Sequence, residues 1–180
     1  QGDPQQGELD DEGLTPTAVA VRIDDGEIVK MLLKEGADIN HPGVGGRTPL
    51  AEAASRGNVR MIDFLTTKGA DPEVRNPGVD DGNAIVAATV ARQPRSVEAL
   101  IRKGAKVDTP MADGRTSLVK AMEARDSQLV DLLLMADLQR NFDHPREFMY
   151  TLAERYQSKD RGYSDVESIL NEAADHARQF

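Results

Sequence analysis

The stretch VKMLLKEGADIN, from Val29 to Asn40, decides the fold because it recurs further along the chain. Its first half places apolar residues at helical spacing, and its second half passes through a glycine into a short polar turn. Three related stretches follow: FLTTKGADPE at 64–73, LIRKGAKVD at 100–108 and a degenerate copy, LLLMADLQ, at 132–139. A helix that runs into the same kind of turn again and again indicates a repeated structural unit.

Two markers keep one register through all four copies. The turn positions stand 33, 35 and 33 residues apart, at Gly36, Gly69, Gly104 and Asp137. A tripeptide led by Thr or Asn begins 21 residues before each of them, at Thr15, Thr48, Asn83 and Thr116. A repeat of about this length with two fixed markers is typical of a helical array.

The second copy, residues 41–73, predicts two short helices joined by a tight turn. The hydroxyl of Thr48 is placed to accept a free backbone N–H at the start of the first helix, and Pro49 follows where no N–H donor is needed. Gly57 ends this helix and Gly69 ends the second, each in a left-handed conformation that a side chain would penalise. One such unit cannot bury its apolar faces alone, so we expect consecutive units to stack.

This pattern resembles the ankyrin repeat family over residues 13–137. The matching residues are Thr15-Pro16, Thr48-Pro49-Leu50, Ala53-Ala54, Gly57 and the turns GADIN, GADPE and GAKVD. The sequence departs from the family where a His often follows Thr-Pro-Leu, since those places hold Ala18, Ala51, Val86 and Val119. The resemblance implies an all-α, ankyrin-type helical solenoid of four divergent repeats.

Three segments follow from this pattern. Residues 1–12 are polar and acidic and are expected to be a flexible N-terminal segment, and residues 13–140 carry the repeats. Residues 141–180 contain two further helical patterns in the place of a fifth repeat, and we interpret them as a C-terminal helical cap. The alternative is a separate helical hairpin that takes part in binding.

Composition narrows the classes of partner and site. The formal net charge is −9, so the chain gains nothing from neutralising phosphates and we expect no nucleic-acid partner. The longest apolar runs are too short for a bilayer, so we expect no membrane insertion. Cysteine is absent, which excludes disulfides and thiolate chemistry but does not decide the compartment. A soluble protein is expected, periplasmic if a signal peptide was removed before Gln1 and otherwise cytoplasmic.

The sequence offers no set of residues typical of an enzyme or a metal centre. The three histidines, His41, His144 and His176, show no metal-ligand spacing, and the two Asp-Asp-Gly stretches lack the remaining ligands of a calcium loop. No phosphate-binding glycine loop and no nucleophile motif is present. We therefore expect no catalytic activity and no cofactor.

The remaining candidate is a binding surface. The ankyrin resemblance implies a concave face made of the loops and the exposed positions of each first helix. Our candidate partner-binding residues on that face are Arg22, Val44, Arg47, Glu52, Arg56, Val79, Asp80, Asp81, Met111, Asp113, Arg115 and Lys120.

Two features of this face invite a functional interpretation, and each has a plainer alternative. Arg47, Arg56, Arg115 and Lys120 place positive charge on an otherwise acidic molecule, although Glu52 lies among them and ordinary mixed surface charge would look the same. The third loop, with the sequence NPGVDDGN, is longer than the others, which is consistent with a binding loop or with a tolerated surface insertion.

The sequence thus predicts a non-catalytic protein-interaction module. The narrower hypothesis is an inhibitor or immunity protein that blocks a cognate bacterial enzyme or toxin. The alternative is a scaffold or effector adaptor with weak and multiple partners. The oligomeric state is left open.

Overall fold

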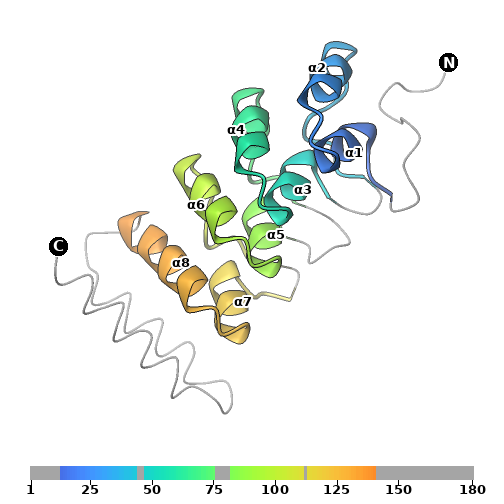
Figure 1. Cartoon of the computed structure of the whole chain (residues 1–180). Helices are drawn as coiled ribbons and strands as arrows, with labels where there is room; N and C mark the ends of the chain where they lie inside the picture. Colours follow the sequence, from blue (N-terminus) through green and yellow to red (C-terminus); the bar gives the residue numbers. More distant parts are fainter. Residues whose placement is uncertain (1–12, 44–46, 76–81, 112, 141–180) are drawn as a thin grey trace.

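The computed structural model describes residues 13–43, 47–75, 82–111 and 113–140. These residues form eight α-helices arranged as four pairs (Figure 1): α1 (Pro16–Arg22) with α2 (Gly26–Lys34), α3 (Pro49–Ser55) with α4 (Val59–Thr67), α5 (Ala84–Val90) with α6 (Pro94–Arg102), and α7 (Ser117–Glu123) with α8 (Ser127–Arg140). The prediction of an all-α stack of helix pairs is confirmed. The expected N-terminal segment and C-terminal cap lie outside the described residues.

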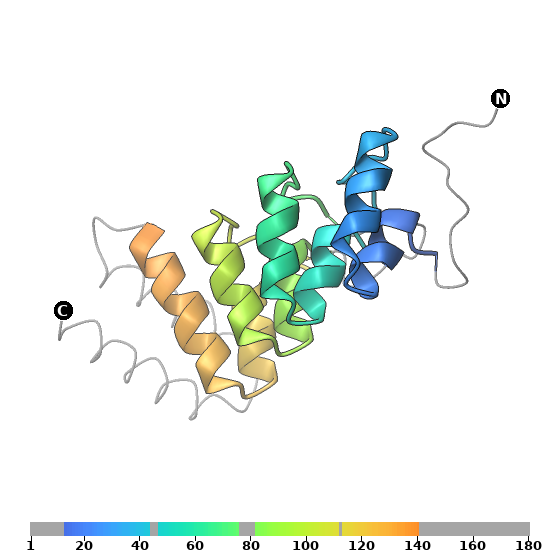
Figure 2. The ribbon, with the colours of Figure 1, turned by 45° about the horizontal axis from the view of Figure 1, so that its top comes forward.

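The pairs stack in two layers. The first helices α1, α3, α5 and α7 form one layer, and the second helices α2, α4, α6 and α8 form the other (Figure 2). Each first helix packs on the second helix of its own pair and on the first helix of the next pair, and α6 packs on both α4 and α8. The inner pairs α3–α4 and α5–α6 are therefore covered on both sides, whereas α2 of the first pair leaves Ile28 and Met31 exposed.

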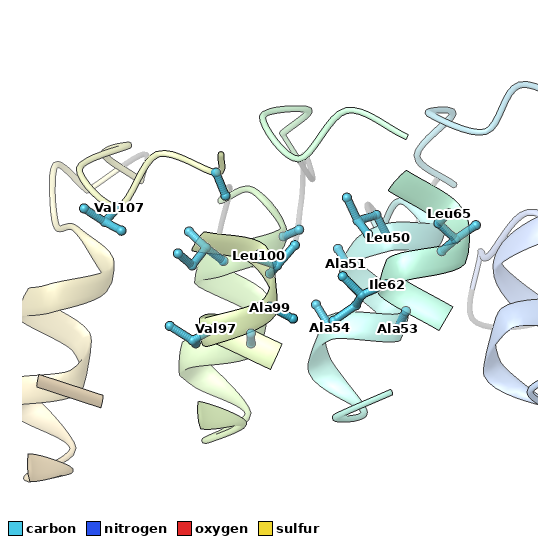
Figure 3. Packing of buried hydrophobic residues seen from close by; sticks show 14 of the residues in the cluster. Leu50, Ala51, Ala53, Ala54, Ile62, Leu65, Val97, Ala99, Leu100 and Val107 are labelled. Atoms are coloured by element: carbon cyan, nitrogen blue, oxygen red, sulfur yellow. The ribbon is translucent and has the colours of Figure 1, made fainter. Parts of the chain in front are cut away.

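Small aliphatic residues fill the space between the layers. Leu50, Ala53 and Ala54 of α3 meet Ile62 and Leu65 of α4, and all five are essentially inaccessible to solvent (Figure 3). Alanine on the first helices lets neighbouring helices approach closely, while leucine and isoleucine supply most of the apolar area. This division of sizes explains how a chain with 4% aromatic residues builds a continuous core.

The first helix of each pair starts on a side-chain hydrogen bond. The side-chain oxygens of Thr15, Thr48, Asn83 and Thr116 accept from the backbone N–H three residues later, at 3.2, 3.1, 3.3 and 3.5 Å. Each bond satisfies one of the backbone donors that the first turn of a helix leaves free. The expectation for Thr48 is confirmed, and it extends to the equivalent position of every pair.

The helices end at residues in the left-handed conformation. Gly36, Gly69 and Gly104 have φ angles of +94°, +98° and +87° at the ends of α2, α4 and α6. At Gly69 the chain closes with two hydrogen bonds, from Gly69 N–H to the carbonyl of Thr66 at 3.1 Å and from Ala70 N–H to that of Leu65 at 2.9 Å. These bonds satisfy helix-end carbonyls and reverse the chain, so the predicted role of the KEGAD stretch is confirmed.

The first helices end in the same geometry, mostly without glycine. Gly57 follows α3, but Asp24, Arg92 and Arg125 follow α1, α5 and α7 with φ angles of 60°, 54° and 53°. A side chain in this region costs roughly 1 kcal/mol relative to glycine. The turn between paired helices is thus kept even where the residue type disfavours it.

The polar residues after each glycine link one repeat to the next. Asn40 accepts the backbone N–H of Asp71 at 2.8 Å, and Glu73 accepts that of Lys106 at 2.7 Å. Glu73 also accepts from the hydroxyl of Thr109 at 3.1 Å. The last residue of GADIN and of GADPE therefore acts as an acceptor for the corresponding turn one repeat later.

The fourth pair departs from the predicted register. Helix α8 continues through Asp137 to Arg140, so the turn expected at Asp137 is wrong. No glycine stands at this position to take the left-handed conformation at low cost, as Gly36, Gly69 and Gly104 do at the ends of the other second helices, which favours continuation of the helix.

We expect Gly69→Ala to destabilise the stack by about 1–2 kcal/mol, because alanine would have to adopt a φ of +98°. An added Cβ would meet no atom within 4 Å, so the loss would come from the backbone alone. Urea unfolding followed by circular dichroism measures it. The control is Gly26→Ala at the first residue of α2, where the φ angle is not positive and space is open. Equal losses at both positions would contradict this account.

Glu73→Ala should lower the free energy of unfolding by about 1–2 kcal/mol, since it removes an acceptor of backbone and hydroxyl hydrogen bonds from the next repeat. The matched variant is Glu98→Ala, which breaks only an exposed pair with Arg102 at 3.1 Å and should cost less than about 0.5 kcal/mol. Chemical denaturation of both variants distinguishes them. If Glu73→Ala is as mild as Glu98→Ala, the inter-repeat link does not stabilise the fold.

Candidate functional site

The exposed positions of the first helices form one surface, which we call the first-helix face. It consists of Val19, Arg22 and Ile23 with α1, Ser55 and Arg56 with α3, Ala87, Val90 and Ala91 with α5, and Lys120, Glu123 and Ala124 with α7. Ile23 is 61% exposed and Val90 is 44% exposed, so this face offers large apolar side chains to solvent. Sequence reasoning predicted most of these residues to lie on this face but missed Ile23. Ile23 occupies the same position in its repeat as Arg56, and this equivalence could have indicated it.

A buried carboxylate organises two arginines on this face. Glu52 is only 3% exposed, and its two oxygens receive the Nε of Arg56 at 2.7 Å and the Nη1 of Arg47 at 3.4 Å. Arg47 Nη1 also lies 3.4 Å from the hydroxyl of Ser55. The prediction that Glu52 is exposed is therefore wrong, because a carboxylate under two guanidinium groups is covered by them and compensated in charge. Glu52 positions Arg47 and Arg56, which stay partly accessible.

A second cluster of charges lies at the fourth repeat. Arg115 Nη1 lies 2.9 Å from both oxygens of Glu123, and the same guanidinium pairs with Asp113, whose carboxylate receives its Nε at 2.6 Å. Hydrogen bonds from Arg115 hold the pKa of Asp113 below its ordinary value, and those to Asp113 and Glu123 raise the pKa of Arg115. Lys120 Nζ lies 4.0 Å from Glu123. This cluster balances two cations with two carboxylates.

The positive charge expected on this face is thus largely neutralised. Arg47, Arg56, Arg115 and Lys120 each have a carboxylate neighbour, and both clusters together carry four cations against three anions. Only the Arg47–Glu52–Arg56 cluster keeps a net charge of +1. The face is better described as an exposed apolar strip on α5 between two sets of paired charges.

The structure contradicts the predicted position of one loop residue, Met111, and does not describe four of the other candidate loop residues. Met111 is 4% exposed, so the prediction that it lies at an accessible loop tip is wrong. Its backbone pairs with that of Arg115 and Gly114 in a tight turn, which directs Asp113 to solvent and leaves Met111 buried. Val44, Val79, Asp80 and Asp81 lie outside the described residues.

The described residues form neither a metal-binding cluster nor a membrane-spanning helix. Among the described residues no three His, Asp or Glu side chains gather as they would around a metal ion. His41 is partly exposed, and His144 and His176 lie outside the described part of the chain. No helix of the described segments is long and apolar enough to cross a bilayer.

Sequence reasoning named Arg56 but missed the rest of a row of arginines at the turns between paired helices. These turns lie along one edge of the stack, which we call the turn edge (Figure 2). Five exposed arginines belong to it: Arg56, Arg60, Arg92, Arg95 and Arg125. The signal was present, because Arg60 and Arg95 share one register position and Arg92 and Arg125 share another.

Comparison with known proteins agrees with the geometry. A family model described as ankyrin repeats in three copies matches residues 2–76. The chain is 29% identical over 133 residues to a putative ankyrin repeat protein of Rickettsia felis, covering 74% of this chain and 46% of that protein. It is 33% identical over 110 residues to a putative ankyrin repeat protein of fowlpox virus, covering 61% of this chain and 15% of that one.

A further relative is the B-cell lymphoma 3 protein homolog of Mus musculus, 32% identical over 123 residues, with 68% of this chain and 26% of the relative covered. The chain therefore spans less than half the length of each of these relatives. The repeated helix pairs, their Thr-Pro starts and glycine ends, and these matches show that the chain belongs to the ankyrin repeat family.

Proposed function

We propose that this chain binds another protein through the first-helix face and the loop tips beside it. Ankyrin repeats generally act as protein-binding modules. The observation that carries the proposal is the exposed apolar strip of α5 and its surroundings, where Val90 is 44% exposed beside the partly exposed Ala87 and Ala91. An apolar patch bordered by paired charges is typical of a protein interface, in which an apolar centre is ringed by polar groups.

The Arg47–Glu52–Arg56 cluster supports the same face. Because Glu52 holds the guanidinium of Arg56 at 2.7 Å and that of Arg47 at 3.4 Å, these side chains lose less conformational freedom when a partner binds. A planar guanidinium pairs well with carboxylates, and arginine is enriched among the residues that dominate binding energies. Arg47 and Arg56 are therefore the anchors we propose for a carboxylate of the partner.

The narrower form of the proposal is inhibition. An immunity or inhibitor protein of a bacterial enzyme or toxin would cover the partner's active site with such anchors and with the loop-tip residues Val44, Val79, Asp80, Asp81 and Asp113. Arg115 and Lys120 would lie at the rim, where charges affect the association rate more than the lifetime of the complex. A tight, salt-resistant complex that loses enzymatic activity supports this form.

One observation favours the alternative of a scaffold or adaptor. The chain spans 46% of the Rickettsia felis relative and 15% of the fowlpox virus relative, which shows that such repeats occur within much longer proteins. In such a setting the repeats of this chain would tether a partner without changing its activity. Weak complexes that leave the partner's activity unchanged support this alternative.

The test is a pull-down from lysate of the source organism with two matched variants. Val90→Arg places a charge in the apolar strip and should reduce recovery of the bound partner at least about tenfold, since desolvating an unpaired charge is costly. Met31→Arg changes an apolar side chain on α2 that is 67% exposed, away from the first-helix face, and should leave recovery unchanged. Mass spectrometry quantifies the partner after a salt wash.

The same comparison can contradict the proposal. A partner retained equally by Val90→Arg and the unmodified chain would remove the first-helix face from consideration. A partner lost with Met31→Arg but retained with Val90→Arg would move the interface to the second-helix layer. Circular dichroism of both variants confirms that they are folded.

A further inference from the structure

The turn edge carries a charge pattern that the first-helix face does not explain. In repeats 2 to 4 the turns at 56–60, 91–95 and 124–128 contain five arginines and one acidic residue, Asp126. The corresponding turn of repeat 1, at 23–27, contains Asp24, Asp25 and Glu27 and no cation. The turns of repeats 2 and 3 each contain two arginines and no acidic residue, whereas the turn of repeat 4 contains Arg125 beside Asp126 and is formally neutral. The edge is therefore positive over repeats 2 and 3 in a molecule whose formal net charge is −9.

Most of this positive charge is not used inside the fold. Within the described part of the chain, Arg60, Arg95 and Arg125 are exposed and form no hydrogen bond or ion pair. Arg92 donates to the carbonyl of Ala124 at 3.2 Å, and Arg56 pairs with Glu52 at 2.7 Å. Three of the five guanidinium groups are thus available to a partner.

The nearest carboxylates along the second helices do not neutralise the row. Asp63 on α4 pairs with Lys103 at 3.0 Å, and Glu98 on α6 pairs with Arg102 at 3.1 Å. Asp126 accepts the backbone N–H of Leu129 at 3.2 Å at the start of α8. Asp63 and Glu98 are therefore paired with cations outside the turn edge, whereas Asp126 keeps its negative charge next to Arg125 in the sequence.

Two of the arginines stand where the backbone favours glycine. Arg92 and Arg125 have φ angles of 54° and 53°, at the position that Gly57 occupies with a φ of 75°. The left-handed conformation gives no advantage to arginine over glycine, so the turn itself does not require these side chains. Arg92 contacts the carbonyl of Ala124 within the fold, so a role outside the fold is consistent mainly with the presence of Arg125.

We propose that the turn edge of repeats 2 to 4 binds an extended acidic segment of another protein. Neighbouring packed helices lie about 8–10 Å apart, so equivalent arginines recur at about that distance. An extended chain advances about 3.3 Å per residue, and carboxylates at every third residue therefore match the row. The turn edge adjoins the first-helix face and shares Arg56 with it, but the three unpaired arginines, Arg60, Arg95 and Arg125, lie outside that face. The inference therefore does not depend on the function proposed above.

Charge favours a protein segment over a nucleic acid. The row of arginines is limited to three repeats, since the turn of repeat 1 holds only the acidic residues Asp24, Asp25 and Glu27, and the overall charge of −9 opposes a long polyanion. No aromatic residue belongs to the turns at 56–60, 91–95 and 124–128, so no side chain there can stack on a base. A short acidic segment avoids both difficulties.

The experiment measures fluorescence anisotropy of a labelled peptide built of Glu-Ser-Gly units against the full chain at low ionic strength. Saturable binding is expected, and it should weaken with added salt because exposed charges are screened. The triple variant that combines Arg60→Gln, Arg95→Gln and Arg125→Gln should bind the peptide about tenfold more weakly, since it removes the three unpaired guanidinium groups.

The matched control is the triple variant Lys34→Gln, Lys68→Gln, Lys106→Gln. It removes the same charge from exposed lysines at the ends of α2 and α4 and in the turn after α6, away from the turn edge. Binding by this control should stay within about twofold of the unmodified chain. Equal weakening by both triple variants would overturn the proposal. The proposal would also be overturned if an oligothymidylate bound more tightly than the peptide. The same holds if a peptide with its glutamates in one block bound more tightly than the peptide of Glu-Ser-Gly units.

Discussion

None of the four helix pairs within residues 13–140 can cover its own apolar surface, and the structure depends on this constraint. Leu50, Ile62 and Leu65 are fully buried because α3 lies between α1 and α5 while α4 packs on α6. Each pair therefore gains much of its stability from its neighbours, as expected for a linear array. Alanines at the contacts and sharp reversals at the ends of α1 to α7 are the local features that such stacking requires.

The reversals and the links between repeats use the same short stretch of chain. A glycine with a φ near +94° ends α2, and the polar residues after it place Asn40 against the backbone of the next turn. Glu73 repeats this arrangement one unit later. Because the turn and the link belong to one motif, a sequence that preserves GADIN or GADPE preserves both chain direction and register.

Much of the fold was predictable because it rests on local chemistry. Thr48, Pro49, Gly57 and Gly69 act within a few residues of themselves, so their roles follow from spacing alone. The candidate face was harder, since burial of Glu52 requires Arg47 from the preceding loop as well as Arg56 on its own helix. Burial of Met111 likewise depends on a turn closed by Arg115. The arginines of the turn edge recur at fixed positions of the repeat, but most of those positions are not among the binding positions that the ankyrin resemblance implies.

Native-state hydrogen exchange along residues 13–140 tests the central claim, which is that stability passes between stacked pairs. Amides of α3 to α6, packed on both sides, should share the highest protection, and those of α1 and α2 should exchange faster because Ile28 and Met31 face solvent. Equal protection of α1–α2 and α3–α6 would contradict the claim, since it would mean that each pair is stable without its neighbours.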